Sequence, residues 1–302
     1  MRVLVTGASG QLGRDVADVL AEATPPGGCK RTDGKGRRAG AAIELMAADH
    51  RSLDVSERDQ VAAAFEAFRP QAVIHCAAWT AVDACEADAV RAFAVNAMGT
   101  RHVAEAARRH GTHMVYVSTD YVFDGTSDRP YVEWDQTNPL SVYGRSKRGG
   151  ELELDAADTI VRTSWVSGYH GANMVRTVLR LAASDQPMRF VDDQRGNPSF
   201  TADLATALVL LSTERLPGVF HLTNQGATTW FEFARAVMSA SGQDPQRVSP
   251  ISTAELQPPR PAPRPANSVL ANTAWQALGM PLLPPWQEAL GRLVSAIAIG
   301  GS

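Results

Sequence analysis

The chain has 302 residues, of which 44% are hydrophobic and 20% are charged, a composition typical of a globular protein with one large domain or two unequal ones. Its formal net charge of −3 gives no general attraction to nucleic acid or to a membrane surface, so a small molecule is the expected ligand. No apolar run approaches the roughly 18 residues that a membrane span needs, and the first residues lack the order of a signal peptide, so we expect a cytoplasmic protein.

The first half of the chain alternates short apolar runs with amphipathic segments. Strands are expected at 1–6, 43–47, 72–78 and 113–119, and helices at 11–23, 57–68 and 90–110. Strands that are almost continuously apolar are typical of a parallel sheet with helices on both faces. The sequence therefore predicts an α/β protein with a doubly wound parallel sheet.

Two segments interrupt this alternation. Residues 24–42 contain glycines, prolines and five basic side chains, and we interpret them as a surface loop, with attraction of a phosphate as the alternative. Residues 258–265 are rich in proline, which excludes a helix or a central strand and favours a connector across the surface of a smaller domain. Helices are expected on either side of this connector, at 230–241 and 285–297.

Three glycines follow the first strand in a G-x-x-G-x-x-G spacing, at Gly7, Gly10 and Gly13. The first suits a tight turn, the second lets a pyrophosphate approach the backbone, and the third lets the helix pack closely on the strand. Free amides at the start of the helix then bind the anion. This turn predicts a Rossmann-type dinucleotide-binding domain.

An acidic residue after the second strand is expected to read the adenosine ribose of such a dinucleotide. Asp49 would accept a hydrogen bond from a free 2′-hydroxyl, whereas the neighbouring Arg51 would accept a 2′-phosphate, so NADH and NADPH both stay open. Asp54 is a candidate for the adenine side, with a capping role before the next helix as the alternative.

Tyr143 and Lys147 are spaced four residues apart, which places both on one face of a helix. A phenol is a poor acid at neutral pH, but a fixed positive charge and the nicotinamide ring nearby lower its pKa, so Tyr143 is expected to protonate a ketone oxygen while a hydride arrives. Lys147 is also expected to hold the nicotinamide ribose. Thr119 ends the fourth strand, where its hydroxyl can reach the same carbonyl.

In this order along the chain, these motifs resemble the extended short-chain dehydrogenase/reductase family, and within it the branch that reduces dTDP-linked 4-keto sugars. The resemblance covers nearly the whole chain. The segments that carry it are TGASGQLG (6–13), HCAAWTAVDACE (75–86), VNAMGT (95–100), STDYVFDG (118–125), YGRSK (143–147), RTSWV (162–166), RPANSVLAN (264–272) and PPWQEAL (284–290).

The resemblance implies hydride transfer from NADPH or NADH to C4 of dTDP-4-dehydro-β-L-rhamnose, which gives dTDP-β-L-rhamnose. It assigns the proton chemistry to Thr119, Tyr143 and Lys147. The implied cofactor contacts are Gly7, Gly10, Gln11, Leu12, Gly13, Asp49, Asp54, Val55, Ala77, Ala78, Trp79, Tyr143 and Lys147; the implied sugar and nucleotide contacts are Thr119, Asp120, Tyr121, Trp165 and Arg264.

Several of these residues have structural alternatives. Trp165 follows an expected strand and would then be a core residue. Arg260 and Arg264 are the cations expected to grip a nucleotide diphosphate, with Arg264 preferred; the alternative is that they only keep a proline-rich loop soluble. Asn96 and Asn173 would bond substrate or backbone, or would be helix caps. Some members of the family bind magnesium, but Asp15 and Asp192 match those positions only approximately.

No metal site is predicted. His110 and His113 lie at the end of a helix, where a histidine commonly completes the C-terminus. The three cysteines, Cys29, Cys76 and Cys85, contain no C-x-x-C pair, so we expect neither a disulfide nor a zinc site.

We therefore expect a dinucleotide-binding domain from 1–165, to which 195–220 return, and a smaller nucleotide-sugar domain mainly from 166–302, in a monomer or a homodimer. Two other functions stay open. One is an epimerase or 4-ketoreductase for another nucleotide sugar, and the other is a non-catalytic regulatory subunit with the same fold.

Overall fold

The computed structural model describes residues 1–23, 42–184 and 187–300. Nearly all of the predicted basic loop, together with Cys29, lies outside the described residues. None of the helices in the described part is long and apolar enough to cross a membrane.

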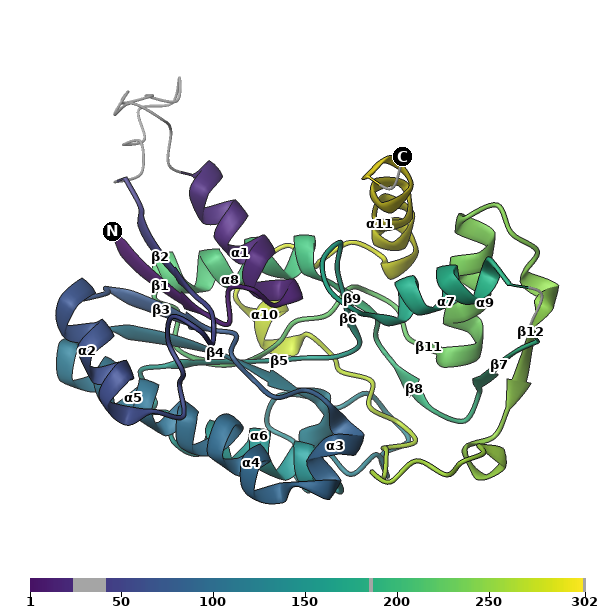
Figure 1. The fold of residues 1–302 in the computed structure, drawn as a ribbon, viewed down its shortest axis with the longest axis horizontal. Helices are drawn as coiled ribbons and strands as arrows, with labels where there is room; N and C mark the ends of the chain where they lie inside the picture. The colour runs from purple at the N-terminus through teal and green to yellow at the C-terminus, as the bar shows by residue number, and fades with distance from the viewer. Residues whose placement is uncertain (24–41, 185–186, 301–302) are drawn as a thin grey trace.

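Six parallel strands form one sheet at the centre of the molecule, in the order β10-β5-β4-β3-β1-β2 (Figure 1). The chain starts in the interior strand β1, adds β2 on one side and then continues with β3 on the other. The switch point between β1 and β3 is where an open parallel sheet binds ligands, at the carboxyl ends of its strands. The strands span Arg2–Thr6 (β1), Glu44–Ala48 (β2), Ala72–His75 (β3), His113–Thr119 (β4), Thr159–Thr163 (β5) and Gly218–His221 (β10).

Helices cover both faces of the sheet because its strands are apolar on both sides. Val3 and Val5 of β1 are buried in a core with α1 (Gln11–Glu22) and α8 (Thr201–Glu214). Leu4, between them, is buried on the opposite face with α2 (Arg58–Phe68) and α5 (Gly99–His110). The predicted Rossmann-type, doubly wound α/β architecture is confirmed.

A second, smaller core lies beside the sheet (Figure 1). Helices α7 (Met174–Ala182), α9 (Trp230–Ala240) and α11 (Trp286–Gly300) pack around it with the strand pair β7 (Met188–Val191) and β12 (Val248–Ile251). Two further pairs lie between the sheet and this core: β6 (Val166–Ser167) with β9 (Ser199–Phe200), and β8 (Arg195–Gly196) with β11 (Thr228–Thr229). The remaining helices are α3 (Val82–Ala87), α4 (Ala89–Phe93), α6 (Val142–Glu151) and α10 (Thr273–Ala277).

Three predicted segments differ in detail. The strand expected at 72–78 leaves the sheet after His75, because residues 76–78 cross over the glycine turn, where the Ala77 amide donates to Thr6 Oγ1 (3.4 Å). The helix expected at 90–110 contains a π-helical turn at Ala94–Met98. The proline-rich connector does not stay on the smaller part of the molecule: the Ala262 amide donates to Asp83 of α3 (3.2 Å).

Candidate active site

The turn between β1 and α1 has the geometry that a dinucleotide pyrophosphate requires. Gly7 has a φ of +68°, and a Cβ there would lie 2.7 Å from the Ala77 nitrogen. A Cβ on Gly13 would overlap the Gly7 carbonyl, so the helix packs directly on the turn. No side chain caps α1 at Gly10, which leaves the first amides of the helix available to an anion. These residues fit a bound dinucleotide.

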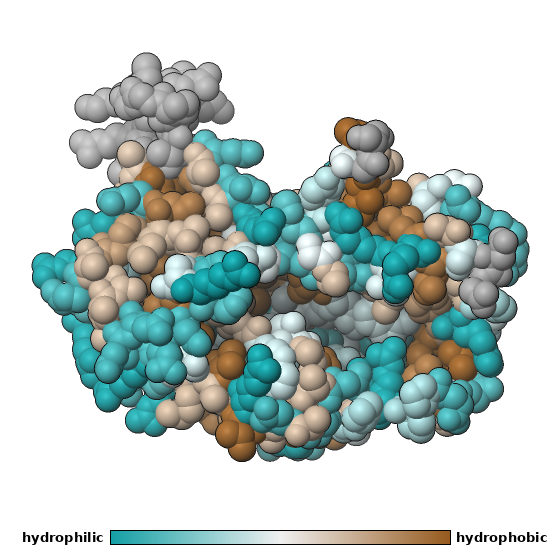
Figure 2. Space-filling model, in the orientation of Figure 1, coloured by the Kyte–Doolittle hydropathy of each residue, from teal (hydrophilic) through white to brown (hydrophobic). Residues whose placement is uncertain are grey.

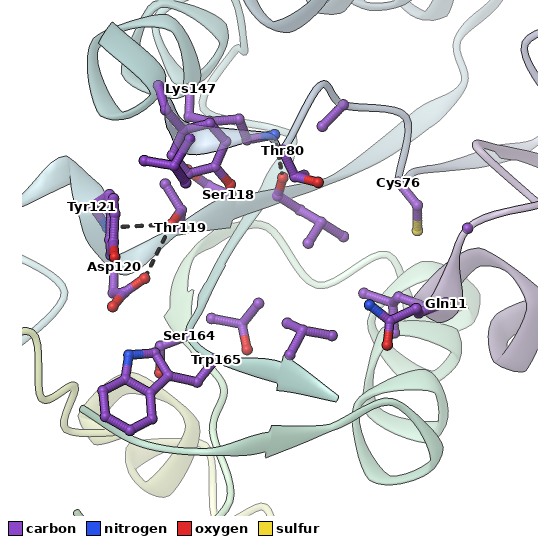
Figure 3. A pocket seen from close by; sticks show the side chains of 18 of the residues that line it. Gln11, Cys76, Thr80, Ser118, Thr119, Asp120, Tyr121, Lys147, Ser164 and Trp165 are labelled. Atoms are coloured by element: carbon purple, nitrogen blue, oxygen red, sulfur yellow. Dashed lines mark hydrogen bonds between the residues drawn. The ribbon is translucent and has the colours of Figure 1, made fainter. Parts of the chain in front are cut away.

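A cavity of about 380 Å³ opens at the carboxyl ends of the strands, next to this turn. It lies between the part of the molecule that carries the sheet and the part that carries α7, α9 and α11, where Figure 2 shows the surface hollowed. Figure 3 shows Gln11 and Cys76 at one end and Thr119, Asp120 and Tyr121 at the other. Predicted site residues in its lining are Gly7, Gly10, Gln11, Leu12, Gly13, Ala78, Thr119, Asp120, Tyr121, Tyr143, Lys147 and Trp165.

The remaining predicted residues do not line the cavity: Asp49, Asp54, Val55, Ala77, Trp79 and Arg264. Asp49 follows β2 and accepts hydrogen bonds from the Ser52 amide (3.0 Å) and, to a smaller effect, the Arg51 amide (3.1 Å), which lower the pKa of its carboxyl. Asp54 accepts from the Ser56 amide (2.9 Å) in the turn before α2, so it caps that turn, whereas Glu57 is the N-cap of the helix.

Asn96 and Asn173 both have clear structural roles. Asn96 is fully buried and holds the backbone of Trp79 on both sides, because its Oδ1 accepts from the Trp79 amide (2.8 Å) and its Nδ2 donates to the Trp79 carbonyl (3.0 Å). Asn173 caps α7 and also donates to Gln11 Oε1 (2.9 Å). The Gln11 side chain is therefore committed to the segment before α7, where its Nε2 also donates to the Ala172 carbonyl (3.1 Å).

Thr119, Tyr143 and Lys147 meet at the inner wall of the cavity. Thr119 ends β4, while Tyr143 and Lys147 come from successive turns of α6. The Lys147 ammonium donates to the Val117 carbonyl (2.7 Å) and lies 4.2 Å from the centre of the Tyr116 ring. The Thr119 hydroxyl donates to Asp120 Oδ1 (3.0 Å) and accepts from the Tyr121 amide (3.2 Å).

Burial controls the protonation of both side chains on α6. It lowers the pKa of Lys147 to about 7 and raises that of Tyr143 well above its ordinary value. In the protein without a dinucleotide the phenol pKa is therefore raised, and its lowering by Lys147 together with a bound nicotinamide stays a prediction. The raised pKa nevertheless keeps Tyr143 protonated at neutral pH, which is the form that a proton donor needs.

Trp165 has a strained backbone, with a φ of +47°, and its indole stacks on Trp230 with ring centres 3.6 Å apart and planes 9° from parallel. Both rings line the cavity. The sequence analysis did not identify Trp230, which comes from the smaller core. The pattern Thr229-x-x-Glu232 was the available signal, because this capping box starts α9 at Trp230 and so fixes it at the front of the helix.

Arg264 is not a free cation. Its guanidinium forms a bidentate pair with Asp83, at 3.0 and 2.8 Å, and its side chain is 9% exposed. Arg260 is exposed and forms no ion pair with any residue that the structure describes. The Arg260 guanidinium is therefore available to a phosphate, whereas the Arg264 guanidinium is already paired with a carboxylate.

Among the residues that the structure describes, one group of side chains has the spacing of possible metal ligands. Asp15, Asp18 and His170 bring possible ligand atoms within 4.8 Å of one another, as exposed acidic groups often do without a metal. Asp192 is not part of this group and instead accepts a hydrogen bond from Thr229 Oγ1 (2.6 Å). The two histidines of the sequence pair have different neighbours. His113 Nε2 lies 2.9 Å from Thr159 Oγ1, whereas His110 Nε2 lies 3.8 Å from Glu66 Oε2.

Comparison with known proteins agrees with the sequence motifs. A protein of Streptomyces griseus named dTDP-4-dehydrorhamnose reductase is 42% identical over 298 residues, which cover 96% of this chain and 91% of that protein. A dTDP-4-keto-6-deoxy-D-glucose reductase of Streptomyces niveus is 38% identical, with 96% and 95% covered.

A crystal structure of dTDP-4-dehydrorhamnose reductase from Bacillus anthracis in complex with NADP superposes with a TM-score of 0.85 at 34% identity, over 97% of this chain and 98% of that one. The family model described as the RmlD substrate binding domain matches residues 1–299. The resemblance predicted from the motifs is confirmed: this chain belongs to the RmlD substrate binding domain family.

Proposed function

We propose that this protein uses NADPH or NADH to reduce the C4 ketone of dTDP-4-dehydro-β-L-rhamnose, which gives dTDP-β-L-rhamnose. One observation carries the proposal: a single cavity joins an anion-binding glycine turn to Thr119, Tyr143 and Lys147. The similar proteins named as reductases of this sugar support the choice of substrate.

The dinucleotide, when bound, supplies the hydride. The backbone from Gly7 to Gly13 would hold its pyrophosphate, because this is where the amides at the start of α1 are uncapped. The nucleoside halves would be bordered by residues that follow two neighbouring strands: Val55 after β2, and Ala77, Ala78 and Trp79 after β3. Asp49 and Asp54 would lie along the adenosine ribose and adenine, each with one carboxylate oxygen already used in a local turn.

Tyr143 donates the proton. Its side chain lines the same cavity as the glycine turn, and its raised pKa keeps it protonated before the reaction. Transfer of this proton to the ketone oxygen completes the alcohol when the hydride reaches C4. The Thr119 hydroxyl would bond the same oxygen, and the Lys147 ammonium would hold the nicotinamide ribose and stabilise the tyrosinate that forms.

The sugar and its diphosphate would occupy the end of the cavity away from the glycine turn. Asp120, Tyr121 and Trp165 line that end. Arg264 would reach the diphosphate only if its pair with Asp83 opened, or it would act by fixing the loop that presents Arg260. In this proposal, 1–165 and 195–220 bind the dinucleotide, and the rest of 166–302 binds the nucleotide sugar in a protein that is a cytoplasmic monomer or homodimer.

A second candidate is reduction of a different dTDP-linked 4-keto sugar. It is favoured by the similarity to the Streptomyces niveus protein, whose name gives another 4-keto sugar as substrate. The presence of all three reactive side chains in one cavity argues against the non-catalytic alternative.

The test is Tyr143→Phe beside the control Tyr169→Phe, whose ring lies outside the cavity lining. Loss of the phenolic proton should lower kcat by about 10² or more, while NADPH binding, followed by nucleotide fluorescence, stays within a factor of two of the wild type. Turnover by Tyr143→Phe equal to that of the control would contradict this mechanism.

A further inference from the structure

His75 is a fully buried histidine at the end of β3, beside the glycine turn but outside the cavity lining. Its Nδ1 lies 2.7 Å from Thr6 Oγ1, and its Nε2 lies 3.2 Å from Thr100 Oγ1. Thr6 ends β1 directly before Gly7, and Thr100 lies in the first turn of α5, directly after the π-helical turn. The imidazole therefore connects the strand that enters the glycine turn with the helix on the far side of β3.

The hydrogen bonds along this connection run in one direction. The Thr100 hydroxyl donates its only proton to the Asn96 carbonyl (2.7 Å), so it can only accept from His75. Burial lowers the pKa of His75 to about 3, so the ring is neutral and its single N–H is on Nε2. Nδ1 then accepts from the Thr6 hydroxyl, which in turn accepts from the Ala77 amide (3.4 Å). Both ring nitrogens are therefore used, and the connection is continuous from residue 77 to residue 96.

Helix α6 rests on the Asn96 end of this connection, and Figure 1 shows it beside α4 and α5 on one face of the sheet. The Asn96 side chain donates to Ser146 Oγ (2.9 Å), one residue before Lys147. The Tyr116 hydroxyl lies 3.2 Å from the Lys147 carbonyl oxygen and 3.5 Å from the Asn96 carbonyl oxygen. A Cβ on Gly150 would overlap the Tyr116 oxygen and lie 2.6 Å from the Asn96 oxygen. Because α6 packs this closely, a shift of the π-helical turn must also move α6.

We propose that His75 is a positioning residue that sets the distance between the glycine turn and the helix that carries Tyr143 and Lys147. This inference rests on the proposed reductase function, in which the turn holds the dinucleotide and Tyr143 gives the proton. Hydride and proton must reach the two atoms of one carbonyl group, so the dinucleotide and the phenol have to be aligned. A displacement of about 1 Å in such a site can slow a reaction by about 10².

His75→Asn tests the two halves of the connection separately. The asparagine Oδ1 can replace Nδ1 as the acceptor for Thr6, but the shorter side chain cannot reach Thr100. We expect the rate of NADPH oxidation in a single turnover, with NADPH and the sugar both saturating, to fall by about 10- to 100-fold. The Kd for NADPH, measured by nucleotide fluorescence, should be unchanged because the glycine turn keeps its hydrogen bond.

Thr100→Val removes the same link from the other side with a side chain of the same shape, so it provides the test if His75→Asn does not fold. It should slow the single turnover to a similar extent and also leave the Kd for NADPH unchanged. Because both substitutions break one connection, the double variant should be no slower than His75→Asn alone.

The control is His113→Asn. His113 is also buried and also lies beside a threonine hydroxyl (2.9 Å), but it is at the opposite end of β4 from Thr119. This variant should lose stability without slowing the single turnover. The proposal would be overturned by a wild-type rate in folded His75→Asn, by equal slowing in His113→Asn, by a parallel loss of NADPH binding, or by additive effects in the double variant. A wild type that does not reduce the sugar would instead overturn the proposed function, and this inference with it.

Discussion

Gly13→Ala is the sharpest test of how the glycine turn works. The new Cβ would lie 2.8 Å from the Gly7 carbonyl carbon and 2.9 Å from the Ala8 Cα, and both of these are backbone atoms that cannot turn aside. Helix α1 must therefore move away from the turn. Overpacking of this kind costs about 1–3 kcal/mol, which outweighs the ~0.5–1 kcal/mol that alanine gains over glycine in a helix.

The same shift should weaken dinucleotide binding. Loss of one amide hydrogen bond to a charged phosphate costs about 1.5–3 kcal/mol, which is a rise of roughly 10- to 100-fold in the Kd for NADPH. Fluorescence titration measures the Kd, and urea unfolding measures the stability.

Gly291→Ala is the matched control, because a Cβ on this glycine of α11 meets nothing within 4 Å. It should leave NADPH binding unchanged and stabilise the protein slightly. The reasoning would be refuted if Gly13→Ala bound NADPH as tightly as Gly291→Ala does.

Three further changes test other parts of the structure. Glu151→Gln disrupts the buried ion pair with Arg162 (2.9 Å) and should lower the free energy of unfolding, measured by urea titration, by about 3–5 kcal/mol. The control Glu288→Gln, which affects an ion pair on the surface, should change it by less than about 1 kcal/mol. The pKa of Asp120 is raised from 3.8 to about 7 on folding, so its contribution to stability is complete below about pH 4 and is lost as the pH rises through about 7. The unfolding free energy of the wild type should therefore fall relative to that of Asp120→Asn across this window, and a difference that is independent of pH would contradict the shift. Trp230→Ala removes the ring that fixes the strained indole beside it, and should raise KM for the nucleotide sugar without changing the Kd for NADPH; equal changes in both would count against a sugar-side role.

The sheet and the reactive side chains were predictable because their signals are local. The run of apolar residues before Gly7 indicates a buried strand, and the four-residue spacing of Tyr143 and Lys147 fixes a shared helix face. These features depend only on the neighbouring sequence, so the structure could add little to them.

Contacts between distant segments were not predictable. The sequence around Arg264 contains no nearby acidic partner, yet Asp83, which lies 181 residues earlier in the chain, pairs with it. The Gln11 side chain is bound to a segment about 160 residues away, and Trp230 reaches the cavity from the second core. The pKa of Tyr143 depends on burial, which no spacing of residues reveals.

The central claim is tested most directly by following NADPH and NADH oxidation with dTDP-4-dehydrorhamnose generated in the same reaction, and by identifying the product by NMR. We expect oxidation that depends on the sugar and yields dTDP-β-L-rhamnose. Folded protein that binds NADPH but leaves this sugar unreduced would contradict the account.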